Sequence, residues 1–168
     1  MLQQCVIIIM GSNKDLAFAT SVGSKLEFFG IDYEYRVASA HKTPRELLKM
    51  LEAYETSEKS VVYVTVAGLS NALSGFVDAS TSYPVIACPP SEKLELDVYS
   101  SLRMPSGVAP LVILNPENAA LAAAKIFGLE NPAVCERVKV YQLEKRKEVS
   151  RSDNEIREKT KSKRPKTE

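Results

Sequence analysis

The sequence predicts a single α/β domain, a three-layer sandwich in which helices cover both faces of a central parallel sheet. Two observations predict this fold. Short runs of apolar, β-branched residues alternate along the chain with segments of helical periodicity. The apolar runs also lack alternating polar residues, which is typical of strands that are covered on both faces. Strand, helix and strand should therefore follow one another through right-handed crossovers.

Five apolar runs are the expected strands: residues 5–10, 33–37, 61–67, 83–88 and 110–114. Four helices are expected between and after them: residues 16–29, 44–54, 116–127 and the segment from Pro132. Gly30 stands where the first helix needs a C-cap. Thr43, Pro44 and Glu46 predict an N-cap, a first helical residue and a capping-box partner for the second helix. The result is an open sheet of the flavodoxin-like or Rossmann-like kind.

The composition is that of an ordinary globular protein, with 45% hydrophobic and 26% charged residues among 168 and a net charge of +1. It gives no reason to expect nucleic-acid or membrane binding. The apolar run at residues 5–10 is too short to span a bilayer and has no basic segment before it. Cys5, Cys88 and Cys135 are widely spaced and odd in number, so reduced thiols and a cytoplasmic location are expected.

The C-terminal segment differs from the rest of the chain. Residues 141–168 carry a net charge of +4, whereas the remainder carries −3, and they contain only four apolar side chains. We therefore expect a domain of residues 1–143, including a C-terminal helix, and a charged, largely disordered tail at 144–168. Such a tail is either a solvated terminus or a basic arm that docks on an acidic partner.

Three loops follow the carboxyl ends of the first three predicted strands, where ligands bind in open α/β sheets. They are residues 11–15, 38–43 and 67–75. Each combines small and hydroxyl residues and leads toward a helix, whose N-terminus favours anions. Ser12, Ser39 and Lys42 are candidates for holding a phosphate, and Asp15 for accepting hydrogen bonds from a sugar hydroxyl. Alternatively, Ser12 and Asp15 form a capping box and Ser70 caps a helix, with no ligand at all.

His41, in the stretch RVASAHKTP, is the only histidine of the chain. Histidine changes charge near neutral pH, so it is a candidate acid and base. The alternative is a surface or hydrogen-bonded structural residue. With no second histidine, a histidine-based metal cluster is excluded. The first loop lacks both G-x-G-x-x-G and the P-loop GK[ST] pattern, which disfavours dinucleotide and nucleoside-triphosphate sites.

Five motifs, in this order, resemble the phosphoribosylaminoimidazole carboxylase family of purine biosynthesis. They are IIIMGSNKD, VASAHKTP, VAGLSNALSGFVD, VIACPP and YSSLRMPSG. The resemblance covers about residues 6–129. It implies an enzyme of the carboxylase (class II) type, which adds CO2 to aminoimidazole ribonucleotide (AIR) to give carboxyaminoimidazole ribonucleotide (CAIR). The alternative is the class I type, which moves a carboxylate from N5 to C4 of N5-carboxyaminoimidazole ribonucleotide.

The class II type is favoured because Lys42 follows His41 where class I has Arg, and because the third loop has no second histidine. The resemblance implies no metal or other cofactor, CO2 as co-substrate, and a homo-octamer whose residues 100–107 close a site. A more remote hypothesis is a non-catalytic nucleotide-binding module.

The resemblance also implies a role for each candidate site residue. His41 is the expected acid and base. The phosphate and ribose are expected at Gly11, Ser12, Asp15, Ser39, Ala40 and Lys42. The aminoimidazole ring and CO2 are expected at Gly68, Ser70, Asn71 and Ser74.

Two residues depart from the family pattern. Lys14 stands where the family usually has Ser, which adds a cation beside the expected phosphate site. Leu69 stands where class II usually has Arg, so any contact of that Arg to substrate or neighbour is lost. These departures affect the expected substrate contacts more than the expected reaction.

Overall fold

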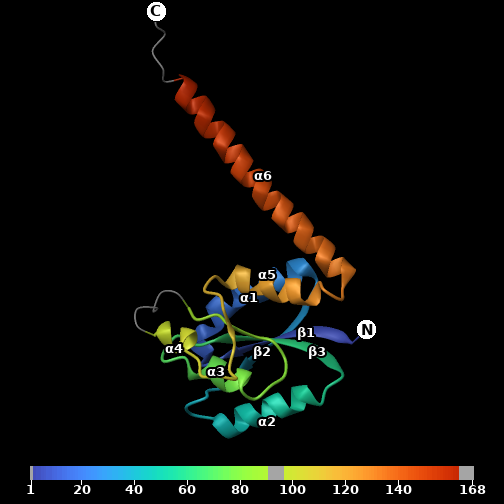
Figure 1. Ribbon diagram of the computed structural model, residues 1–168, viewed down its shortest axis with the longest axis vertical. Coiled ribbons are helices and arrows are strands. Elements are labelled where there is room, and N and C mark those ends of the chain that lie inside the picture. The colour runs from blue at the N-terminus through green and yellow to red at the C-terminus, as the bar shows by residue number, and fades with distance from the viewer. Residues whose placement is uncertain (1, 91–96, 163–168) are drawn as a thin grey trace, which may run out of the picture.

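The computed structural model describes residues 2–90 and 97–162, which form one α/β domain and a projecting helix (Figure 1). A five-stranded, all-parallel sheet has the strand order β2-β1-β3-β4-β5, so the predicted fold class is confirmed. The strands are β1 (Gln3–Met10), β2 (Asp32–Val37), β3 (Lys59–Val66), β4 (Val85–Ala87) and β5 (Leu111–Val112). The last two are shorter than the apolar runs that predicted them.

The helices lie on both faces of the sheet, as a parallel sheet requires. Helices α1 and α5 cover one face together with the start of α6, and α2 and α3 cover the other (Figure 1). The helices are α1 (Leu16–Phe29), α2 (Pro44–Glu55), α3 (Ala72–Asp78), α4 (Tyr99–Leu102), α5 (Pro116–Phe127) and α6 (Pro132–Ser162), and a 3-10 turn, η1 (Asn13–Asp15), precedes α1.

Strand β1 lies at the centre of the sheet and supplies both hydrophobic cores. Val6, Ile8 and Met10 pack toward α1 and α5, whereas Ile7 and Ile9 pack toward α2 and α3. All are buried. Successive side chains of a strand point to opposite faces, so a central strand needs an unbroken apolar run. The sequence CVIIIM meets that need.

The caps follow the predictions in part. Gly30 ends α1 in the left-handed conformation, with φ of 67°, as expected. Thr43 precedes α2, but its side chain makes no capping hydrogen bond to that helix, so the predicted capping box is wrong there. The Thr43 hydroxyl instead accepts a hydrogen bond from the Ser39 backbone N–H at 3.0 Å. It thereby braces the turn before the helix.

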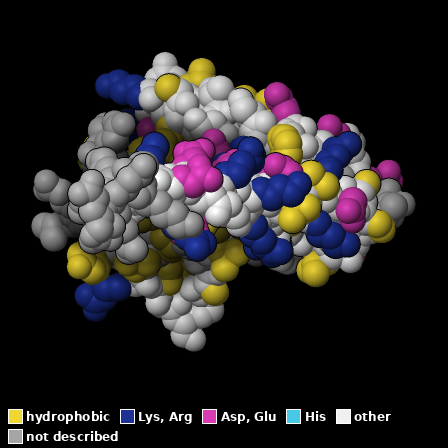
Figure 2. Space-filling model, turned by 90° about the horizontal axis from the view of Figure 1, so that it is seen from above, with side chains coloured by type: hydrophobic (Ala, Val, Ile, Leu, Met, Phe, Trp, Pro, Cys, Tyr) yellow, Lys and Arg dark blue, Asp and Glu magenta, His cyan; other side chains and the backbone are white. Residues whose placement is uncertain are grey.

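Helix α6 differs from the expected tail, because it continues to Ser162. Val134 and Val138 are buried against the domain, while the side chains from Leu143 to Thr160 lie in solvent. Pairs three residues apart, such as Lys145 with Glu148 at 2.9 Å, support a solvated helix without a core. Seen from above, acidic and basic side chains are interspersed on this side of the molecule (Figure 2). Residues 163–168 lie outside the described part of the chain, and the division between domain and tail stays a prediction.

Within residues 2–90 and 97–162, no helix is both long and apolar enough to cross a membrane.

Candidate active site

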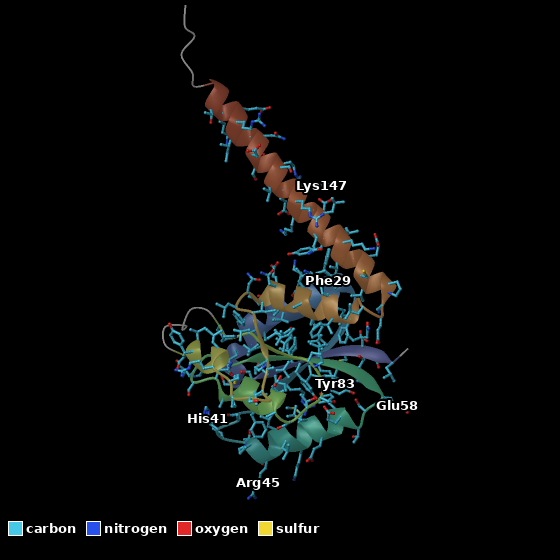
Figure 3. The ribbon with its side chains drawn as sticks, viewed as in Figure 1. Phe29, His41, Arg45, Glu58, Tyr83 and Lys147 are labelled. Atoms are coloured by element: carbon cyan, nitrogen blue, oxygen red, sulfur yellow. The ribbon has the colours of Figure 1, made fainter. Side chains whose placement is uncertain are left out.

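A pocket of about 540 Å³ opens at the carboxyl ends of β1, β2 and β3. In the strand order 2-1-3-4-5, the connection from β1 runs outward to β2, and the next connection returns past β1 to β3. The strand order therefore reverses between β1 and β3. In open α/β sheets, ligands bind beyond the carboxyl ends of the strands at such a point. Figure 3 shows His41 at this end of the sheet and Glu58 at the opposite end. The pocket is lined by Gly11, Ser12, Lys14, Asp15, Ser39, Ala40, His41, Lys42, Ala67, Gly68, Leu69, Ser70, Ala72 and Leu73.

The loop after β1 is held by a capping box. The Ser12 N–H and hydroxyl both donate to Asp15 Oδ2, at 3.1 and 3.2 Å, and Ser12 Oγ accepts from the Lys14 N–H. Ser12 and Asp15 therefore form the capping box that was the alternative to ligand binding. Both residues also line the pocket, so capping and ligand binding do not exclude each other. The Gly11 N–H donates to the Val66 carbonyl at 2.9 Å and ties this loop to β3.

The loop after β2 is one tight turn. The Thr43 N–H donates to the Ser39 carbonyl at 2.9 Å, and the Lys42 N–H donates to Ser39 Oγ at 3.2 Å. The turn exposes the His41 side chain toward the pocket. Within the described residues, His41 has no hydrogen-bond partner. The structure therefore does not support a hydrogen-bonded structural role for the His41 side chain.

The loop after β3 presents Gly68, Leu69 and Ser70 to the pocket. Ser70 has a φ of 39°, in the left-handed region that favours glycine. A non-glycine residue held there carries local strain, and such strain concentrates at functional sites. The Ser70 N–H donates to Asp97 Oδ1 at 3.2 Å, so the loop is fixed from outside the pocket.

Two predicted site residues lie away from the pocket. Asn71 is buried, and its side-chain carbonyl accepts from the Ser74 N–H at 3.2 Å, so that Asn71 and not Ser70 caps α3. Ser74 is also buried, and its hydroxyl has no hydrogen-bond partner among the described residues. The structure brings the other predicted residues together around the pocket and leaves these two beneath its third loop.

Residues 100–107, expected to close a site, pack against the third loop of the same chain. Ser100 Oγ accepts a hydrogen bond from the Asn71 N–H at 2.8 Å. The thioether of Met104 lies against Gly75, where an added Cβ would be 3.2 Å from its sulfur. This segment therefore supports the pocket wall from behind.

Part of the pocket lining lies outside the predicted site residues. Lys14, which the sequence marks only as an additional cation beside the expected phosphate site, lines the pocket itself. The apolar wall was missed as well: Ala67, Leu69, Ala72 and Leu73. Their position in the same loops as the polar candidates was the available signal, but small and apolar residues carry no chemistry of their own.

The pocket lining combines hydroxyl and ammonium groups with apolar side chains. Lys14, His41 and Lys42 lie on its wall with one carboxylate, Asp15. Among the described residues there is no group of three or more His, Cys, Asp or Glu side chains placed to hold a metal ion. The fold and this pocket define a flavodoxin-like α/β protein whose first three strands end at a pocket lined by hydroxyl, ammonium and imidazole groups.

Comparisons with known proteins identify the family. The AIR carboxylase family matches residues 5–148. The chain is 56% identical over 153 residues to phosphoribosylaminoimidazole carboxylase of Archaeoglobus fulgidus, covering 90% of this chain and 84% of that protein. It is 41% identical to a bifunctional carboxylase/succinocarboxamide synthetase of Drosophila melanogaster, of which it spans 36%. The crystal structure of Treponema denticola PurE superposes with a TM-score of 0.87 at 44% identity, covering 91% and 98% of the two chains. The chain belongs to the AIR carboxylase family.

Proposed function

We propose that this enzyme carboxylates AIR with CO2 to give CAIR in purine biosynthesis. The observation that carries the proposal is the single pocket that joins His41 to the hydroxyl and lysine side chains of three loops. A ribonucleotide monophosphate has an anion, two ribose hydroxyls and a flat base, and the pocket offers a matching group for each. Membership of the AIR carboxylase family supports the same reaction.

The phosphate is assigned to Ser12, Ser39 and Lys42. Ser12 and Ser39 both line the pocket, and Lys42 adds an ammonium that can act as a point charge on phosphate. Ser39 Oγ accepts from the Lys42 N–H and keeps its own hydrogen for the phosphate, whereas the Ser12 hydroxyl must turn from Asp15 Oδ2 to reach it. Asp15 is assigned to the ribose. Ser12 uses only Oδ2 of this carboxylate, so Oδ1 is left to accept from a ribose hydroxyl. Gly11 and Ala40 complete this part of the pocket because their small size lets a ligand approach the backbone.

His41 is assigned the transfer of the proton on C4 of the substrate. The C4 atom of AIR is enamine-like, so it can attack the carbon of CO2 directly and form the new C–C bond. The proton on C4 must then leave, and an exposed imidazole facing the pocket can accept it; in the reverse direction the imidazolium returns it. We propose that no metal or other cofactor takes part in this step.

CO2 and the aminoimidazole ring are assigned to the third loop. Gly68 and Ser70 line the pocket beside the apolar side chains of Leu69 and Leu73. These apolar side chains offer no group that would hold water at the place where CO2 must bind. Asn71 and Ser74, which the family resemblance places at the substrate, are assigned instead to holding this loop and α3.

Assembly and location belong to the same proposal. We propose a cytoplasmic homo-octamer whose pockets lie near contacts between copies. Leu69, Tyr99 and Leu102 support this arrangement because they are large apolar side chains, each more than half exposed, on segments at the pocket and behind it. Large apolar side chains that gather on one surface mark interaction sites.

The deciding experiment supplies the purified protein with AIR and bicarbonate in one assay and N5-carboxyaminoimidazole ribonucleotide in another. We expect CAIR to form from AIR at a rate that rises with CO2. Formation of CAIR only from the N5-carboxy compound would establish the mutase reaction instead. Nucleotide binding without turnover in either assay would establish a non-catalytic binding module.

A further inference from the structure

Lys14 lies on the wall of the pocket, next to the serine that we assign to the phosphate. It is the middle residue of the 3-10 turn Asn13–Asp15, which Ser12 caps. The Lys14 N–H donates to Ser12 Oγ at 3.2 Å. The turn therefore holds the Lys14 backbone against the Ser12 hydroxyl. The long side chain of Lys14 starts at the edge of the proposed phosphate site.

The ammonium group of Lys14 has no ion-pair partner among the described residues. Two other lysines of the domain do pair: Lys25 with Glu117 at 3.1 Å and Lys59 with Glu34 at 2.7 Å. Asp15 is the only carboxylate among the described residues that line the pocket, and it already accepts two hydrogen bonds from Ser12.

Lys42, on the loop after β2, likewise has no ion pair within the described part of the chain. Two uncompensated ammonium groups thus come from neighbouring loops to one pocket. A phosphate monoester carries close to two negative charges at neutral pH. One lysine leaves part of that charge unmatched, whereas a pair of lysines balances it.

We propose that Lys14 binds the substrate phosphate together with Lys42, so that the loops after β1 and β2 clamp it from two sides. This inference rests on the proposed function, because the phosphate belongs to the ribonucleotide substrate. A lysine suits this position, since its four-carbon stem can follow the phosphate while the backbone stays in the capped turn. Lys14 is then a binding residue that takes no part in the proton transfer.

The test compares Lys14→Met, which removes the charge and keeps most of the length, with Lys14→Arg, which keeps the charge. Lys49→Met is the matched control, because Lys49 is an exposed lysine on α2 outside the pocket lining. In Lys14→Met we expect the KM for AIR at low salt to rise about three- to tenfold with an unchanged kcat, and the difference to shrink as salt is added. Lys14→Arg and Lys49→Met should stay near the wild-type KM.

Inorganic phosphate serves as a second probe, measured as a competitive inhibitor and by calorimetry. Its affinity should fall in Lys14→Met by a similar factor and remain unchanged in Lys49→Met. If Lys14→Met keeps both the wild-type KM and the wild-type phosphate affinity at low salt, the inference is overturned and the carboxylase function stands. A wild-type protein that binds phosphate but does not carboxylate AIR overturns the proposed function, and the phosphate titration still decides the role of Lys14.

Discussion

The side-chain amide of Asn71 donates to Ser101 Oγ at 2.9 Å, and both residues are buried. This hydrogen bond joins the loop after β3 to α4, thirty residues further along the chain. The carbonyl of the same amide caps α3. One side chain thus fixes the third loop of the pocket from two directions.

Replacing Ser101 with Ala should destabilise the protein, because the buried Asn71 amide loses its acceptor. We expect a loss of about 1–2 kcal/mol in the free energy of unfolding, measured by urea denaturation. Ser152→Ala is the control, since this exposed hydroxyl on α6 bonds, among the residues that the structure describes, only to the Glu148 carbonyl of its own helix. Equal stabilities of the Ser101 and Ser152 variants would show that the bond contributes nothing.

His41→Asn should fold and bind nucleotide but lose turnover. The side chain is exposed and has no partner among the described residues, so its replacement removes no structural contact. We expect kcat for AIR carboxylation to fall by about 10²–10⁴-fold, as for the loss of a general acid or base. Thermal unfolding and nucleotide titration provide the controls. Near-normal turnover would remove His41 from the mechanism.

The three cysteines should differ in reactivity. Burial raises the pKa of the Cys5 thiol to about 11 and that of the Cys88 thiol to about 12, so little of the reactive thiolate form exists at neutral pH. Cys135 is only partly buried. Alkylation of the native protein with iodoacetamide, followed by mass spectrometry, should therefore modify Cys135 first. In urea all three should react at similar rates; native labelling of Cys88 as fast as that of Cys135 would contradict the buried site.

Glu34 should make stability depend on pH. Hydrogen bonds from Lys59 Nζ at 2.7 Å and from the Tyr54 hydroxyl at 2.6 Å lower the pKa of its carboxyl group. A lowered pKa in the folded state stabilises the protein above the ordinary glutamate pKa, and this contribution disappears as the pH falls through the lowered value.

Glu34→Gln should accordingly be less stable than wild type at pH 7, by about 0.5 kcal/mol because the pair is partly exposed. The difference should narrow as the pH is lowered from 7 to about 3. Glu58→Gln, at an exposed position with no ion pair among the described residues, is the control and should show no such trend. A constant difference across this range would argue against the ionised interaction.

The spacing of apolar residues predicted the sheet and the main helices, because the faces that an element buries determine where its apolar residues stand. The unbroken apolar run of β1 indicates a strand that is covered on both faces. The spacing of Leu26 and Phe29 in α1 indicates a helix that is covered on one face. In the structure these faces form the two hydrophobic cores. The charged helix beyond Leu143 escaped prediction for the same reason. It buries no face, and its stability depends on local pairs such as Lys147 with Glu144.

The loops were predicted to meet because parallel strands end at one edge of the sheet, and the pocket confirms that they do. The direction of individual side chains was not predictable. Asn71 and Ser74 are buried just after Ser70, which adopts a positive φ before α3 begins. Residue type does not report such a backbone conformation, since Ser, unlike Gly, gives no signal for it.

The hydrogen bond from Gly11 to the Val66 carbonyl has a consequence for how this protein acquires its activity. It joins segments more than fifty residues apart, as does the pairing of Met10 with Val66 beside it. Contacts of such long range form late, because the intervening chain must first lose its freedom. During refolding, nucleotide binding should therefore appear together with the completed sheet and after the first helical signal, so ligand capture reports on the whole domain.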